Sequence, residues 1–251
     1  TSALNDQSVR CALGQAFDKQ DLIDVVYNGH GTPANGPFSP GQEGYLEDNG
    51  SLPYDPDAAA AAISAYEAAN GPIKINFSTT TSATNLARAQ FLADAWGAVG
   101  VDVTIDQIEQ SKLINNALLG DPAFDIFGWR NHAGIFVDTQ NFWWNSSAAL
   151  PPGQIALNFG RLKDPVIDDL LGKIRGEADK AKRVAMTEDI NREFAKQCWI
   201  LPINFTDWGV QMKPTVHGIG NSPQADDSGT TQRDGAGFPG QVWLTAAFVE
   251  S

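Results

Sequence analysis

Residues 128–144 combine aromatic and polar side chains that could bind a small molecule without covalent chemistry. Trp129 ends a run of strand-forming residues, and polar residues follow it at once. Aromatic surface beside a few polar groups is typical of small-molecule pockets. The candidate ligand-binding residues are Trp129, Arg130, Asn131, His132, Asp138 and Trp143, together with Trp208 further along the chain. We expect Trp129 to be partly exposed, because the chain leaves the sheet there.

A structural role is the alternative for the aromatic residues at 142–144. Phe142, Trp143 and Trp144 could simply pack in a core, and the sequence leaves both interpretations open.

Residues that would indicate metal binding or covalent catalysis do not occur in the required spacing. The histidines His30, His132 and His217 are far apart and lack metal-ligand spacing. No lysine followed by serine or threonine comes after Gly29-His30-Gly31, as a phosphate-binding loop would need, and the chain has neither a G-x-S-x-G nor an H-E-x-x-H motif. The sequence therefore predicts binding rather than catalysis, with no cofactor.

The composition indicates a folded, acidic protein. Of 251 residues, 42% are hydrophobic and 19% are charged, so the chain can bury a core. The formal net charge of −13 leaves no basic face for phosphates and argues against nucleic-acid binding. No run of about 18 apolar residues, as a membrane-spanning helix would need, is present.

Two cysteines, Cys11 and Cys198, allow two interpretations. They could form a disulfide if the protein is exported. They could equally be two buried free thiols, because a sequence cannot supply the Cα separation that a bridge requires.

The middle of the chain predicts a parallel sheet. Residues 73–77 and 101–105 alternate like strands, and a helical stripe over residues 83–99 separates them. Strand, helix and strand with short connections form a βαβ unit, so the two strands should be parallel neighbours. Residues 124–129 predict a third strand.

Helices and a long loop surround this unit. Apolar residues at 9, 12, 13, 16 and 17 predict an opening helix that Asp6 would cap. A second helix should follow Asp18, with Leu22, Ile23, Val25 and Val26 inward and Gly29 at its end. Residues 28–54 predict a surface loop and residues 199–205 an edge strand. Further helices are expected over residues 56–69, 110–119, 164–174 and 180–197, and a last strand over 241–249.

Several sequence blocks resemble the family 5 extracellular solute-binding proteins of the peptide and nickel type. The opening helix V-R-x-A-L-x-x-A-x-D-K is followed, in the family's order, by a G-x-G-x-P-A turn and a Y-D-P-x-x-A helix start. The remaining matches are L-x-x-x-G-V-x-V-x-I, a strand ending in G-W, D-P-x-x-D, I-L-P-I and V-x-G, at residues 92–105, 125–129, 164–168, 200–203 and 216–218.

The resemblance implies an α/β fold, with a mixed sheet flanked by helices, as one lobe of a two-lobed periplasmic-binding-protein (type II) fold. Residues 1–213 would form the C-terminal ligand-binding lobe, and residues 214–251 a tail that returns to the missing N-terminal lobe of the same protein. Solute capture in the cleft between lobes would serve an ABC importer. The strand that ends in Gly128-Trp129 would then form part of the cleft wall.

The resemblance also implies partners and a location. We expect a monomer that binds a peptide or another small solute and delivers it to ABC permease subunits. The full-length protein is expected to be extracellular or periplasmic and membrane-anchored as a lipoprotein. Because the resemblance covers only part of the family's length, we expect this chain to be a piece of a longer protein.

One departure from the family bears on the solute. In peptide-binding members an aspartate three residues after the tryptophan resembles a counter-ion for the peptide's amino terminus, and here that position is His132. Asp138 could take over that role. The alternative functions are an exported hydrolase and a receptor domain that senses a solute without transport.

Overall fold

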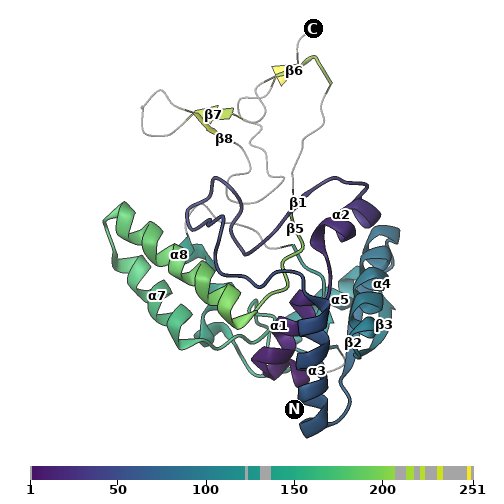
Figure 1. The fold of residues 1–251 in the computed structure, drawn as a ribbon. Helices are drawn as coiled ribbons and strands as arrows, with labels where there is room; N and C mark the ends of the chain where they lie inside the picture. The colour runs from purple at the N-terminus through teal and green to yellow at the C-terminus, as the bar shows by residue number, and fades with distance from the viewer. Residues whose placement is uncertain are drawn as a thin grey trace.

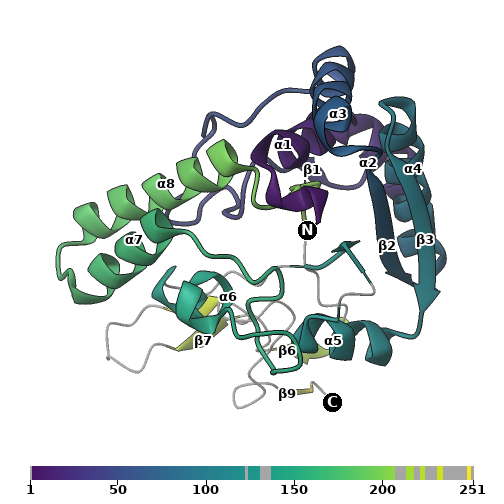
Figure 2. The same ribbon diagram turned by 90° about the horizontal axis from the view of Figure 1, so that it is seen from below.

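A three-stranded parallel sheet lies at one side of the fold, as Figure 1 and Figure 2 show. The computed structural model describes residues 2–121, 124–130, 137–206, 213–217, 221–223, 231–233 and 248–249. The sheet has the order β3-β2-β4, formed by β2 (Lys74–Thr80), β3 (Asp102–Ile108) and β4 (Ile126–Phe127). Both neighbours run parallel to β2, and β2 and β3 lie side by side in Figure 2.

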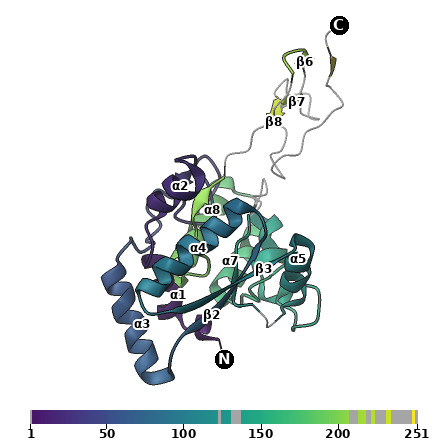
Figure 3. The same ribbon diagram turned by 90° about the vertical axis from the view of Figure 1, so that its right-hand side faces the viewer.

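The βαβ unit predicted from the sequence is confirmed. Ile75 of β2 pairs with Val103 of β3, and α4 (Ala83–Ala98) connects the two strands. In Figure 3, α4 crosses in front of the sheet. Ile75 and Phe77 are buried under this helix, because inward positions alternate along a strand.

One hydrophobic core lies between the sheet and the first helices. The opening helix α1 (Gln7–Gln15) follows a short 3-10 turn (Ala3–Asn5), and Asp6 caps it by accepting from the backbone N–H of Ser8. Its stripe packs against α3 (Pro56–Asn70) and the sheet. Trp96 of α4 is fully buried there and donates from its Nε1 to the Leu13 carbonyl at 3.0 Å.

The second helix, α2 (Lys19–Tyr27), differs from its prediction in two details. Leu22 and Ile23 are buried, but Val25 is 71% exposed, because it lies about 160° around the helix from Ile23. Asn28 adopts the left-handed conformation that ends the helix, and Gly29 follows it with φ also positive.

A second core lies between α7 (Pro165–Gly176) and α8 (Lys180–Gln197), which form a helical hairpin away from the sheet (Figure 2). Trp144 packs into it, with ring centroids 5.8 Å from Phe38 and 4.8 Å from Phe194. Trp144 is therefore a core residue.

The two cores meet where α1 contacts the end of α8. Cys11 and Cys198 form a disulfide with a Cα–Cα separation of 5.2 Å. Arg10 donates from its Nε and Nη2 to the Gln197 carbonyl, and its guanidinium stacks 4.0 Å from the Trp199 ring centroid. Of the two interpretations left open by the sequence, the structure has the bridge.

Several connections are less regular than the sequence predicts. Of residues 199–205, only β5 (Asn204–Phe205) is a strand, and it pairs antiparallel with β1 (Thr32–Pro33) inside the long loop. Pro202 has no N–H to give to a sheet, which limits pairing before β5. Likewise, β4 covers only two residues of the predicted 124–129 strand.

The remaining elements are short or local. Helix α5 (Gln110–Leu119) has its predicted bounds and precedes β4; η2 (Val137–Gln140), α6 (Asn141–Trp144) and η3 (Ser146–Ala148) follow β4. The C-terminal strands pair antiparallel, β6 (Val216–His217) with β9 (Phe248–Val249) and β7 (Asn221–Pro223) with β8 (Thr231–Arg233). In Figure 1 these pairs lie away from the helices and the three-stranded sheet. Antiparallel pairs are thus separate from the parallel sheet.

Within the described part of the chain, none of the helices has the length and apolar character needed to span a bilayer.

Candidate functional site

Six aromatic side chains gather where β4 ends. This aromatic cluster, as we call it, consists of Phe124, Phe127, Trp129, Phe142, Trp143 and Phe159. Phe159 lies at its centre, with ring centroids 5.8 Å from Phe127, 4.9 Å from Trp129 and 5.2 Å from Trp143. These contacts are edge-to-face, the arrangement that aromatic quadrupoles favour. Three chain segments, around residues 124–129, 142–143 and 159, thus converge on one aromatic surface.

The aromatic cluster is only half covered by protein. Trp129 and Phe142 are each 41% exposed, and none of the other four rings is fully buried. An exposed group of aromatic rings costs free energy in water unless a ligand or another surface covers it. The partial exposure of Trp129 agrees with what the sequence predicts.

The position of the aromatic cluster follows from the topology. Parallel strands end at the same edge of a sheet, and ligands of open α/β sheets bind in the crevice at that edge. Trp129 comes two residues after the end of β4, and β2 ends beside β4 at Thr80. The aromatic cluster therefore lies at the carboxyl edge of the sheet.

A braced loop supplies Phe159. Asn158 is buried and forms three hydrogen bonds, to the carbonyls of Asn145 and Leu162 and from the N–H of Leu162. Arg161 donates to the carbonyls of Asn158, Leu118 and Gln154 at 2.9, 2.9 and 3.2 Å. Burial lowers the pKa of the Arg161 guanidinium. These contacts attach the loop to the end of α5 and fix the central ring.

The structure brings together only some of the residues predicted from the sequence. Trp129 and Trp143 both contact Phe159 in the aromatic cluster. Arg130 follows Trp129 directly and is exposed. Asp138 is half-buried in η2, and its backbone carbonyl accepts a hydrogen bond from the side-chain amide of Asn141. Asn131, His132 and Trp208 lie outside the described residues.

Three members of the aromatic cluster were not among the residues singled out from the sequence. Phe127 stands two positions before Trp129, and side chains two apart share one face of a strand, so a signal for it existed. Phe124 begins the same segment. Phe159 has no such signal, because it belongs to a loop thirty residues further on and reaches the others only through tertiary contacts.

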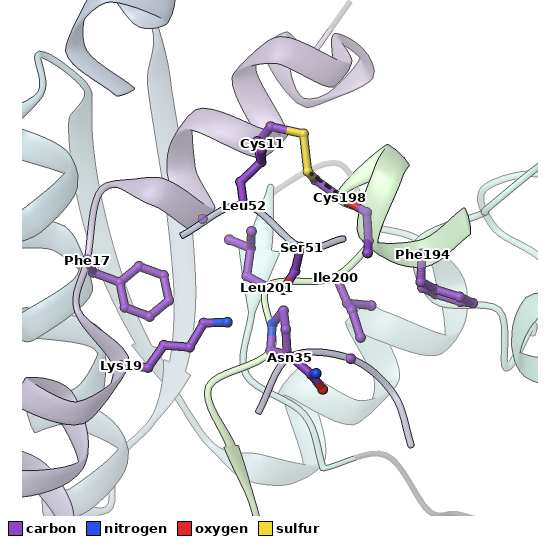
Figure 4. Close-up of a pocket in the computed structure, with 14 residues that line it drawn as sticks. Cys11, Phe17, Lys19, Asn35, Ser51, Leu52, Phe194, Cys198, Ile200 and Leu201 are labelled. Atoms are coloured by element: carbon purple, nitrogen blue, oxygen red, sulfur yellow. Dashed lines mark hydrogen bonds between the residues drawn. A yellow bond between two sulfur atoms is a disulfide. The ribbon is translucent and has the colours of Figure 1, made fainter. Parts of the chain in front are cut away.

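A separate cavity lies behind the disulfide (Figure 4). Its volume is about 40 Å³, and Cys11, Phe17, Lys19, Asn35, Leu52 and Leu201 are among its lining residues. The Lys19 side chain points into it, and its ammonium donates to the Ala34 carbonyl at 2.7 Å. This volume is far below the roughly 300 Å³ of a usual ligand pocket. We place the candidate site at the aromatic cluster because its rings are partly exposed.

No group of three or more potential metal ligands occurs among the side chains that the structure describes. His30 and His217 belong to different parts of the fold, in the loop after α2 and in β6.

The fold is that of the periplasmic binding proteins. The ABC transporter-associated periplasmic binding protein DppA from Helicobacter pylori, in complex with the peptide STSA, is a structural neighbour. It superimposes with a TM-score of 0.69 at 25% identity, over 81% of this chain and 39% of that chain.

Residues 1–151 match the model of the bacterial extracellular solute-binding proteins, family 5 Middle. The chain belongs to this family, whose members are extracellular or periplasmic.

Two related sequences carry different ligand names. Di/tripeptide-binding protein 2 of Pseudomonas aeruginosa strain UCBPP-PA14 is 28% identical over 226 residues, which make up 88% of this chain and 41% of that protein. Heme-binding protein A of Haemophilus influenzae is 28% identical over 225 residues, 88% of this chain and 40% of that protein. The chain spans less than half the length of these relatives.

Proposed function

We propose that this chain supplies one wall of a solute-binding cleft in the substrate-binding component of an ABC importer. The observation that carries the proposal is the half-exposed aromatic cluster at the carboxyl edge of the parallel sheet. A solute would lie over Trp129 and Phe142 and gain affinity from the apolar area that it covers. Membership of the extracellular solute-binding family supports this role.

The proposed solute is a peptide or another small molecule of similar size. The names of the relatives support a peptide, with di/tripeptides for one and the peptide STSA in the complex of another. The name of a third relative, at the same sequence identity as the first, is heme-binding. Sequence identity to the relatives therefore does not indicate the solute. We propose that the polar groups near the aromatic cluster determine the specificity.

The wall needs an opposite surface to enclose a solute. We propose that residues 1–213 form the C-terminal lobe of a two-lobed protein, and that residues 214–251 return to an N-terminal lobe. Closure of the two lobes would then cover the aromatic cluster by hinge bending. The relatives' greater length supports this arrangement. We further propose that the full-length protein is a lipid-anchored monomer that delivers its solute to ABC permease subunits.

Replacing Trp129 tests the proposed function. In the full-length protein, Trp129→Ala should raise the Kd for the solute about 10- to 100-fold, because the variant removes a large apolar contact from the ligand. The free energy of unfolding should fall much less than the 3–5 kcal/mol typical of a buried tryptophan, since the ring is 41% exposed. A thermal-shift screen finds a solute, and titration calorimetry then measures Kd for both proteins.

Tyr54→Ala is the matched control. Tyr54 is another exposed aromatic residue, at 52%, and it lies just before α3, outside the aromatic cluster. This variant should bind the solute like the wild type. If Trp129→Ala instead unfolds readily while its folded fraction binds normally, Trp129 is a core residue and the proposed site is wrong.

A further inference from the structure

Arg88, in α4, carries a positive charge that no described residue neutralises. Its Nε is buried and has no hydrogen-bond partner, and none of the ion pairs among the described residues includes it. A guanidinium offers five donors, and a partly buried one gains most from an anionic partner. The chain has thirty acidic and seventeen basic residues, so a shortage of acids does not explain the missing partner.

The guanidinium of Arg88 occupies the space beside Gly128. A β-carbon at position 128 would lie 2.7 Å from Cζ of Arg88 and 3.3 Å from its Nε, and closer still to Nη2. Gly128 is not among the described glycines with positive φ. Its backbone therefore does not require glycine, and the missing side chain instead leaves room for the guanidinium.

Arg88 and the aromatic cluster thus approach the same strand end. Side chains alternate along an extended chain, so position 128 faces the side opposite to Phe127 and Trp129. Arg88 comes from α4 on one side, and Phe159 contacts both aromatic residues on the other. The guanidinium and the aromatic rings therefore flank the same end of β4 from its two sides.

The acidic residue of this strand segment is already engaged elsewhere. Asp125 accepts the backbone N–H of Asn76 at 2.9 Å through Oδ2 and the hydroxyl of Ser2 at 3.4 Å through Oδ1. These bonds join β4 to β2 and to the N-terminal turn. Neither Asp125 nor any other carboxylate among the described residues forms an ion pair with Arg88.

We propose that Arg88 selects solutes that carry a carboxylate, which its guanidinium binds while the rest of the solute lies over the aromatic cluster. This proposal rests on the proposed function, because it assigns the solute class of the same site. The planar fork of arginine matches the two oxygens of a carboxylate. Gly128 is the positioning residue, because its missing side chain leaves room for the guanidinium of Arg88.

Paired solutes test the proposal in the full-length protein. The probes are dipeptides, tripeptides and aromatic monocarboxylic acids, each with its neutral carboxamide, titrated by calorimetry. The wild type should bind the acid of a pair about 10- to 100-fold more tightly than the amide, as a charge-assisted hydrogen bond requires. Arg88→Met should remove this preference and still bind the amide.

Gly128→Ala provides a second variant that keeps the charge. Its new methyl group should displace the guanidinium, whose end is flexible, and so weaken the preference for acids without unfolding the protein. Arg192→Gln is the control, because it removes the same charge from the exposed face of α8, where Arg192 pairs with Glu188 and Asp189. It should retain the full preference.

Three results would overturn the role of Arg88: equal binding of acid and amide by the wild type, binding of no acid at all, or an unchanged preference in both Arg88→Met and Gly128→Ala. The proposed function is judged separately by Trp129→Ala. A solute whose binding depends on Trp129 but not on charge would leave the proposed function standing and reject the carboxylate.

Discussion

At the scale of single residues, Lys19 places a charge in the cavity behind the disulfide. Its ammonium donates to the Ala34 carbonyl, and no carboxylate among the described residues forms an ion pair with it. Burial lowers the pKa of Lys19, because leaving water disfavours the charged form. The folded protein therefore holds this proton less tightly than the unfolded chain does.

This difference predicts how stability changes with pH. As the pH rises through the lowered pKa towards the usual lysine value of about 10.4, the unfolded chain binds more protons at this site than the folded protein. The free energy of unfolding of the wild type should therefore rise relative to that of Lys19→Met across this range. Urea unfolding at a series of pH values measures both.

Lys182→Met is the control for Lys19, because Lys182 is exposed on α8. The difference in free energy of unfolding between Lys182→Met and the wild type should stay constant over the same pH range. A constant or falling difference for Lys19→Met would show that the folded protein holds the proton as tightly as the unfolded chain does.

At the scale of elements, the loop that carries Phe159 depends on one arginine. Arg161 has φ of 51°, an uncommon value for a residue with a side chain, and its guanidinium connects three backbone carbonyls. Backbone bonds from Gly153 to Leu119 and from Ala156 to Leu118 complete the attachment to α5. The aromatic cluster thus owes its central ring to contacts outside the cluster.

Arg161→Met should loosen this loop without unfolding the protein. Loss of the hydrogen bonds should lower the free energy of unfolding by about 1–3 kcal/mol. Amide hydrogen exchange at Gly153 and Ala156 should become faster, while exchange in β2 stays unchanged. Arg175→Met, at an exposed position on α7, is the control. Unchanged exchange at residues 153 and 156 would contradict the bracing role.

Elements whose signals are local could be predicted from the sequence. Asp6, Asp18, Asp55 and Asp164 each cap a helix within a few residues, and α5 and α8 have the expected bounds. The predicted strand at 199–205 failed because pairing is decided by a distant partner, here β1. The aromatic cluster could be predicted only in part. Trp129 stands at the end of a strand pattern that the sequence shows, whereas Phe159 reaches the cluster only through contacts between distant segments.

At the scale of the whole molecule, the disulfide joins two hydrophobic cores that share one chain. Cys11 lies in α1 and Cys198 ends α8, 187 residues apart in sequence. Gln7 and Arg10 also donate to carbonyls at the end of α8, and Trp199 donates from Nε1 to Asp164 at the start of α7. The junction is therefore held by polar contacts as well as by the bridge.

The double variant Cys11→Ser with Cys198→Ser should fold but be less stable. The chain-entropy model gives a loss of about 5 kcal/mol for a loop of this length, because the unfolded chain gains freedom. Tryptophan fluorescence and urea unfolding measure the loss. Since Arg10 keeps its contact with Trp199, the native fluorescence spectrum should be retained. A variant with no loss of stability, or one without a native spectrum, would contradict this account.

The bridge also determines the order in which the protein can mature. Cys11 is synthesised before its partner, and 186 residues lie between the two cysteines. During that interval the thiol has no correct partner within these 251 residues, and no incorrect one either, because the chain contains only two cysteines. Within these 251 residues, early oxidation therefore has no alternative intramolecular pairing to form.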